Sequence, residues 1–181
     1  LSVDYSCSST IAIRAQQMTT SELQQSCDLM GEEEVLFHNV LGTGNQPVAD
    51  DYNTNLEVNI FNSTADYKDF AGTIFGISTD NGGMYLEGTP SQQGNQARFI
   101  AHEATWLLDG RFNLYGSFSH FNNKTDKSVW WTEGLAEYIS KQNRNDDVIA
   151  LARAQTYTLS EILANDYDSG SERVYSWGYL A

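Results

Sequence analysis

The stretch from Arg98 to Ser140 gives the strongest indication of the fold and chemistry of this chain. It runs Arg98-Phe-Ile-Ala-His-Glu-Ala-Thr-Trp106-Leu-Leu-Asp-Gly-Arg-Phe112, passes through a polar loop, and ends in Trp130-Trp-Thr-Glu-Gly-Leu-Ala-Glu-Tyr-Ile-Ser140. Both ends predict helices that carry acidic groups beside large aromatic side chains. We therefore expect the functional chemistry of the chain to lie on these two helices.

The pair His102-Glu103 begins like the H-E-x-x-H motif of zinc peptidases. Positions four apart share one helix face, so the two imidazoles of that motif point at one metal. Its glutamate faces the metal-bound water, and a carboxylate from a later helix completes the ligand set. Here the fifth position is Trp106, whose indole cannot bind zinc. A His-Glu pair by itself is more often structural than catalytic.

A wider set of residues resembles a known family. The two main stretches are Leu108–Gly116 and Val129–Ser140, and shorter ones occur at 7–16, 29–34, 47–51, 58–63, 82–88, 94–101 and 157–162. Together they resemble the peptidase domain of Vibrio-type microbial collagenases, which are zinc metallopeptidases of the gluzincin group. The resemblance implies an α+β, gluzincin-like fold with a small mixed sheet, an edge strand over the cleft and packed helices. It also implies that residues 1–181 are a single, incomplete peptidase domain.

The resemblance allows two alignments around His102. In the family, H-E-Y-V-H-Y stands directly before L-D-G-R-F. Without a gap, His102 is a zinc ligand, Glu103 is the general base, and Trp106 replaces the second histidine. With a gap, His102 and Glu103 fall on an earlier segment that resembles F-I-A-Y-E-A-S-Y, and the zinc helix is missing between Trp106 and Leu108. We favour the gap, because the match from Gly94 to Ala101 continues into that earlier segment.

The resemblance also assigns the remaining site residues. Under either alignment Glu133, in W-W-x-E-G, is a zinc ligand. Glu87 and the backbone carbonyls of Gly110, Leu114 and Gly116 resemble a calcium site. Gly82, Gly83 and Tyr85 correspond to the edge strand that pairs with an extended substrate. A tyrosine near the end, Tyr175 or Tyr179, is the candidate for stabilising the oxyanion, and Tyr179 is our choice.

The implied function is that of a secreted zinc endopeptidase that cleaves collagen or gelatin with metal-activated water and a glutamate general base, with calcium as a second ion. The alternative is a catalytically inactive collagen-binding or scaffold segment that lacks a complete zinc site. Trp106 separates the two, because a true second imidazole must follow it for the enzyme. Substrate peptide is the expected partner of a monomer.

Composition limits the other classes of function. Forty per cent hydrophobic residues in 181 predict a globular core, and the net charge of −14 disfavours nucleic acid and anionic membranes as partners. No apolar run reaches the roughly 20 residues of a membrane span. Cys7 and Cys27 are the only cysteines. An even count in such a chain suggests one disulfide and an extracellular, oxidising compartment.

Periodicity and capping signals predict the order of the elements. Strands are expected at 10–15, 56–61 and 83–87. Helices are expected at 19–40, from Ser63 or Thr64 to about 70, at 96–108 with a stop at Asp109-Gly110, at 128–141 and 146–154, from Thr158, and from 171 onward.

Overall fold

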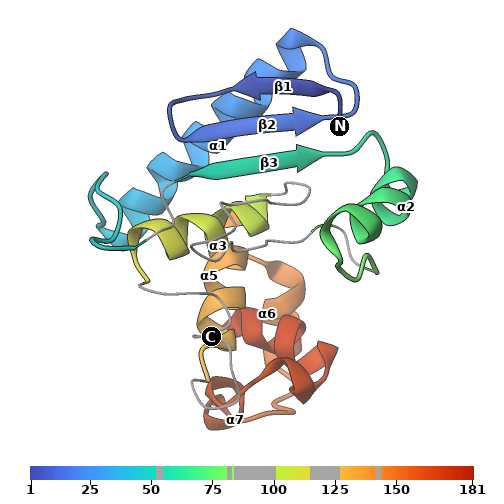
Figure 1. Ribbon diagram of the computed structural model, residues 1–181. Helices are drawn as coiled ribbons and strands as arrows, with labels where there is room; N and C mark the ends of the chain where they lie inside the picture. The colour runs from blue at the N-terminus through green and yellow to red at the C-terminus, as the bar shows by residue number, and fades with distance from the viewer. Residues whose placement is uncertain (52–54, 81–82, 84–100, 115–126, 142–143) are drawn as a thin grey trace. The chain divides into compact units, whose positions relative to one another are not determined.

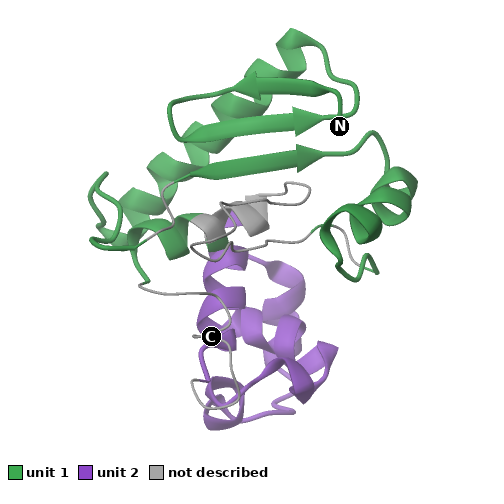
Figure 2. Ribbon diagram, viewed as in Figure 1, with its two compact units in different colours: residues 1–115 green, residues 116–181 purple. Residues whose placement is uncertain are grey.

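The computed structural model describes residues 1–51, 55–80, 83, 101–114, 127–141 and 144–181. These residues form a mixed α and β structure with a small sheet and several helices. The chain divides into two compact units, residues 1–115 and residues 116–181 (Figure 2). All described strands belong to the first unit, and the described part of the second unit is helical.

The sheet of the first unit has three strands in the order β1-β2-β3, namely Val3–Ser6, Ile11–Ala15 and Leu56–Ile60 (Figure 1). β1 pairs antiparallel with β2, and β2 pairs parallel with β3, with Ile13 opposite Val58. The predictions at 10–15 and 56–61 are confirmed. β1 was not predicted, although Val3-Asp-Tyr-Ser6 alternates in polarity, because this run of four residues was not read as a strand without its pairing to β2. The strand expected at 83–87 lies outside the described residues apart from Gly83.

Helix α1, Thr20–Leu41, connects β2 to the loop before β3 and lies along the sheet (Figure 1). Thr19 and Glu22 cap its start reciprocally, since each side chain accepts a hydrogen bond from the other residue's backbone N–H. Gly42 ends it with φ of 66°, a conformation that glycine adopts without steric cost. Its buried residues Leu23, Met30 and Phe37 supply the apolar stripe. The helix predicted at 19–40 is confirmed.

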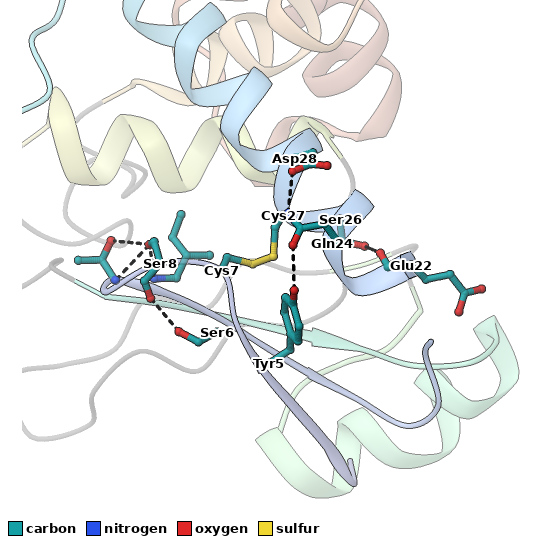
Figure 3. Close-up of a disulfide and its surroundings, with 11 residues drawn as sticks. Tyr5, Ser6, Cys7, Ser8, Glu22, Gln24, Ser26, Cys27 and Asp28 are labelled. Carbon is teal, nitrogen blue, oxygen red and sulfur yellow. Dashed lines mark hydrogen bonds between the residues drawn. A yellow bond between two sulfur atoms is a disulfide. The ribbon is translucent and has the colours of Figure 1, made fainter. Parts of the chain in front are cut away.

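Cys7, which follows β1, is bonded to Cys27 on α1, with the two Cα atoms 5.4 Å apart (Figure 3). Nearby, the Tyr5 hydroxyl donates a 2.9 Å hydrogen bond to Gln24 Oε1. Strand and helix are thus joined at one end by a covalent bond and a hydrogen bond.

Helix α2, Thr64–Phe75, follows β3, and Ser63 caps it by accepting a 3.0 Å hydrogen bond from Asp66 N. Tyr67 and Ala71 pack with Phe61 in a separate apolar cluster. The helix extends five residues past the predicted end at about 70. Gly72 lies inside the helix and does not stop it, and Gly76 ends it with φ of 67°.

Helix α3, Ala101–Phe112, corrects one prediction, since Asp109 and Gly110 lie inside it and do not stop it. Asp109 is only 4% exposed, and its carbonyl accepts from Asn113 N and Leu114 N. The Phe112 ring lies 4.6 Å from the His38 ring of α1, centroid to centroid. This packing outweighs the roughly 1 kcal/mol cost of an internal glycine. The part of the prediction before Ala101 lies outside the described residues.

The second unit consists of α5 (Val129–Ser140), α6 (Asp146–Ala152), α7 (Leu159–Leu163), the 3₁₀ turn η1 (Tyr167–Ser169), the π-helical η2 (Glu172–Trp177) and the 3₁₀ turn η3 (Gly178–Leu180). The starts of α5, α6, α7 and η2 lie within one residue of the predicted starts, and Thr158 caps α7 as expected, whereas η1 was not predicted. The last predicted helix is irregular, because it changes from π to 3₁₀ winding. The core of this unit comprises Val129, Leu135, Ala136, Ile139, Val148, Ile162, Val174 and Trp177.

Candidate functional site

Glu133 lies on the buried side of α5 and has no exposed surface. A buried carboxylate is costly unless it is hydrogen-bonded or paired with a cation. Its Oε1 accepts a 2.7 Å hydrogen bond from the Tyr167 hydroxyl of η1, a residue 34 positions further along the chain. The candidate zinc ligand is therefore a preoriented, buried acid.

A second tyrosine, Tyr175, also interacts with this acid. Loss of water around the hydroxyl, followed by the nearby Glu133 carboxylate, raises the pKa of both Tyr167 and Tyr175 above the ordinary value. Tyr179 of η3, the chosen oxyanion residue, has its ring 6.3 Å from that of Tyr175 and also contributes to the raised pKa of Tyr167. Tyr167 and Tyr175 therefore stay protonated near neutral pH and act there as hydrogen-bond donors.

Glu137, one turn beyond Glu133, has a different environment. It is 7% exposed, and its Oε1 accepts a hydrogen bond from Asn145 Nδ2. The Asn145 Oδ1 in turn accepts from Val148 N and so caps α6. Glu137 thereby connects α5 to the start of α6, which is a structural role.

The other candidate residues are only partly described. His102 and Glu103 lie on α3, on the same helix as Trp106, but their side chains are not described. Glu87, Gly116, Gly82 and Tyr85 also lie outside them, whereas Gly83 is described and buried. Of the candidate calcium carbonyls, Gly110 is inside α3 and Leu114 follows its end.

The sequence contains no H-E-x-x-H pair that would supply both imidazoles of a His₂Glu zinc set. The sequence contains three histidines, His38, His102 and His120, and no two of them are four residues apart. Across the residues that the structure describes, no three His, Cys, Asp or Glu side chains come together in a way that would hold a metal ion. Of the candidate zinc ligands, Glu133 is a buried carboxylate of the kind that zinc uses.

The profile of one protein family, described as collagenase, matches residues 1–181, which is the whole chain. This chain belongs to the collagenase family. A microbial collagenase of Vibrio alginolyticus is 51% identical over 199 positions that include all of this chain and 24% of the relative. Similar proteins named microbial collagenase occur in Vibrio parahaemolyticus, at 41% identity over 98% of this chain and 23% of the relative, and in Vibrio vulnificus, at 40% over 98% and 24%.

Two facts limit what family membership says of this collagenase-family chain. It spans about a quarter of the length of the curated relatives it matches. The alignment with the Vibrio alginolyticus protein covers 199 positions, whereas the chain has 181 residues. That relative therefore carries residues within the matched region which this chain lacks.

Sequence reasoning identified Glu133 but missed its partner. Tyr167 lies in Asp166-Tyr-Asp-Ser169, a polar turn without a motif, and nothing local connects it with α5. A surplus of tyrosines after residue 157 was the only available signal. The described helices provide no segment with both the length and the apolar character needed to cross a bilayer.

Proposed function

We propose that this chain is part of the peptidase domain of a secreted zinc endopeptidase that cleaves collagen or gelatin. The observation that carries the proposal is the family match over the whole chain, together with Glu133 buried at the position where W-W-x-E-G requires the third zinc ligand. Collagen or gelatin peptide as the substrate follows from the names of the relatives.

The zinc set of this proposal needs two imidazoles that the 181 residues do not supply on one helix. Glu133 contributes one carboxylate, already oriented by Tyr167. The gapped alignment around Trp106 agrees with the longer matched region of the Vibrio alginolyticus protein. Under it, the helix with both histidines is absent from the printed chain, and His102 and Glu103 are not the ligand and the base.

The remaining assignments are proposals that also rest on the family resemblance. They comprise a gluzincin-like cleft with Gly82, Gly83 and Tyr85 on its edge strand, a calcium site of Glu87 with the carbonyls of Gly110, Leu114 and Gly116, and Tyr179 near the oxyanion. A Cys7–Cys27 disulfide suits the extracellular compartment proposed here. We further propose a monomer.

A second function is favoured by Trp106. If Leu107 follows Trp106 in the functional protein, the second histidine of the H-E-x-x-H motif is missing. The chain is then a collagen-binding segment without catalysis. The family resemblance then describes ancestry and substrate, but not peptide hydrolysis.

Native mass spectrometry of the protein isolated from its source tests both functions. A mass above 20.2 kDa with one bound zinc, and gelatin cleavage that Glu133→Gln abolishes, is the result expected of the endopeptidase. Glu133→Gln keeps the size of the side chain and removes only the anionic ligand. A mass of 20.2 kDa, no zinc and retained gelatin binding would establish the second function. Neither cleavage nor binding would overturn both.

A further inference from the structure

A pocket of about 270 Å³ lies in the second unit between α5 and the end of the described chain. Its wall is formed by Trp130, Trp131, Gly134, Leu135, Tyr138, Tyr179, Leu180 and Ala181. The volume is just below the range of about 300–1,000 Å³ typical of sites for drug-sized ligands. It therefore suits one small ring or side chain of a larger ligand.

The shape of this aromatic pocket follows from the spacing of three residues on α5. Trp130, Gly134 and Tyr138 are four residues apart and line one face of the helix. Glycine leaves a gap between the two aromatic rings. A Cβ added at position 134 would lie 3.2 Å from the Gly178 carbonyl oxygen, so the η3 backbone closes the bottom of that gap. The result is a notch with aromatic walls.

The walls also offer hydrogen-bond donors. Neither the Trp130 indole nor the Tyr138 hydroxyl takes part in a hydrogen bond within the part of the chain that the structure describes, and Tyr138 is 46% exposed. Among the residues that the structure describes, no charged side chain lines the pocket. Proteins recognise polyproline II peptides with aromatic-lined grooves. The proline rings pack against the flat aromatic side chains, and the peptide carbonyls accept hydrogen bonds from donors such as indole N–H and tyrosine hydroxyl groups.

We propose that the aromatic pocket binds a proline ring of an extended, proline-rich peptide chain of the collagen type, apart from the bond that is cleaved. The choice of this ligand class rests on the proposed function, since collagen chains are polyproline II helices. A neutral ring avoids the repulsion that the net charge of −14 would impose on an acidic peptide. The pocket would hold the substrate chain in register while Glu133, on another side of α5, remains buried.

The test uses the whole 181-residue chain in the presence of EDTA, with decaproline as the probe and a Gly-Ser peptide of equal length as the comparison. Tryptophan fluorescence would report binding, because Trp130 and Trp131 line the pocket. Decaproline is expected to bind, and the Gly-Ser peptide is not. Trp130→Leu and Tyr138→Ser are each expected to weaken decaproline binding about tenfold, as loss of an aromatic anchor does.

Phe70→Ser is the matched control, because Phe70 on α2 is 46% exposed, like Tyr138, and lies outside the pocket. Tyr138→Phe, which removes only the hydroxyl, should weaken binding by a smaller factor and keeps the proposal testable if the larger changes disturb folding. The inference is overturned if decaproline fails to bind, if the Gly-Ser peptide binds equally, or if Phe70→Ser has the same effect.

The EDTA condition separates this inference from the proposed function. A zinc-free chain that binds decaproline upholds the pocket even where gelatin is not cleaved. A chain that cleaves gelatin but does not bind decaproline overturns the pocket alone.

Discussion

The residue on which the proposed zinc site depends is Glu133, a fully buried acid on α5. Burial of a carboxylate is tolerated only where donors or cations replace its lost water. The Tyr167 hydroxyl is such a donor, at 2.7 Å, and hydrogen bonds to charged acceptors are stronger than those between neutral groups. The same contact that stabilises the acid also determines which of its oxygens is turned toward η1.

Tyr167→Phe should therefore lower the free energy of unfolding by about 1–3 kcal/mol, because the buried acceptor loses its donor while the ring stays. Urea unfolding followed by circular dichroism gives the value. Tyr138→Phe is the matched control, since this hydroxyl takes part in no hydrogen bond within the described residues, and no change is expected. Equal stability of Tyr167→Phe and the wild type would show that the hydrogen bond contributes nothing.

Asp166 provides a pH prediction at the same scale. The hydrogen bond from Lys127 Nζ, 2.6 Å from Asp166 Oδ2, followed by that from Ser169, lowers the pKa of Asp166 below its ordinary 3.8. A carboxyl with a depressed folded-state pKa stabilises the protein above its unfolded pKa, and this stabilisation is lost as the pH falls through the folded-state value. We expect the thermal midpoint to fall as the pH decreases below 3.8.

Thermal unfolding from neutral pH down to about pH 2 would measure this dependence. Asp166→Asn should lower the midpoint at neutral pH and flatten its fall in acid. Asp69→Asn, on an exposed position of α2, should leave the curve unchanged. An identical acid profile for Asp166→Asn and the wild type would contradict the assignment.

At the scale of elements, predictions succeeded where a local signal exists. The capping boxes at Thr19 and Thr158 and the glycine after α1 each marked a helix boundary without tertiary information. The end of α3 was missed, because Asp109-Gly110 looks like a stop, whereas Asp109 is buried and Phe112 packs against His38. The short β1 depends on pairing with β2, a long-range contact that its own residues do not reveal.

The bond between Cys7 and Cys27 makes an element-scale prediction. It closes a loop with a sequence separation of 20, which spans the turn after β1, β2 and the first part of α1. A disulfide that closes a loop of this size lowers the conformational entropy of the unfolded chain and so raises the free energy of unfolding by about 3 kcal/mol. Reduction should thus lower the unfolding free energy by that amount in urea titrations.

The double variant Cys7→Ser/Cys27→Ser serves as the control for reduction. Its unfolding midpoint should match that of the reduced wild type and should not respond to added reductant. A wild-type midpoint that is unaffected by reductant would show that the disulfide does not stabilise the fold.

At the scale of the whole molecule, the family that the sequence predicted is confirmed, whereas Glu133 as a zinc ligand stays a prediction. The sequence could not predict the donor arrangement around Glu133. Tyr167 reaches the acid from 34 residues away, through the fold of the second unit. The zinc ligands stay a prediction, because the side chains of His102 and Glu103 are not described and the sequence has Trp106 where a second histidine would follow His102 by one turn. This deficit is one of local sequence, because no two histidines of these 181 residues have the H-E-x-x-H spacing.

A protein of these 181 residues is therefore expected to carry no stoichiometric zinc. The variant Trp106→His distinguishes the two alignments around His102. This change completes H-E-x-x-H from His102 to position 106 on α3. If the zinc helix is missing, as the gapped alignment holds, His102 belongs to a preceding segment, and the variant should remain zinc-free in native mass spectrometry. Trp106→Phe controls for loss of the indole. One tightly bound zinc in Trp106→His alone would instead establish the gapless alignment, with His102 as a ligand and Glu103 as the base.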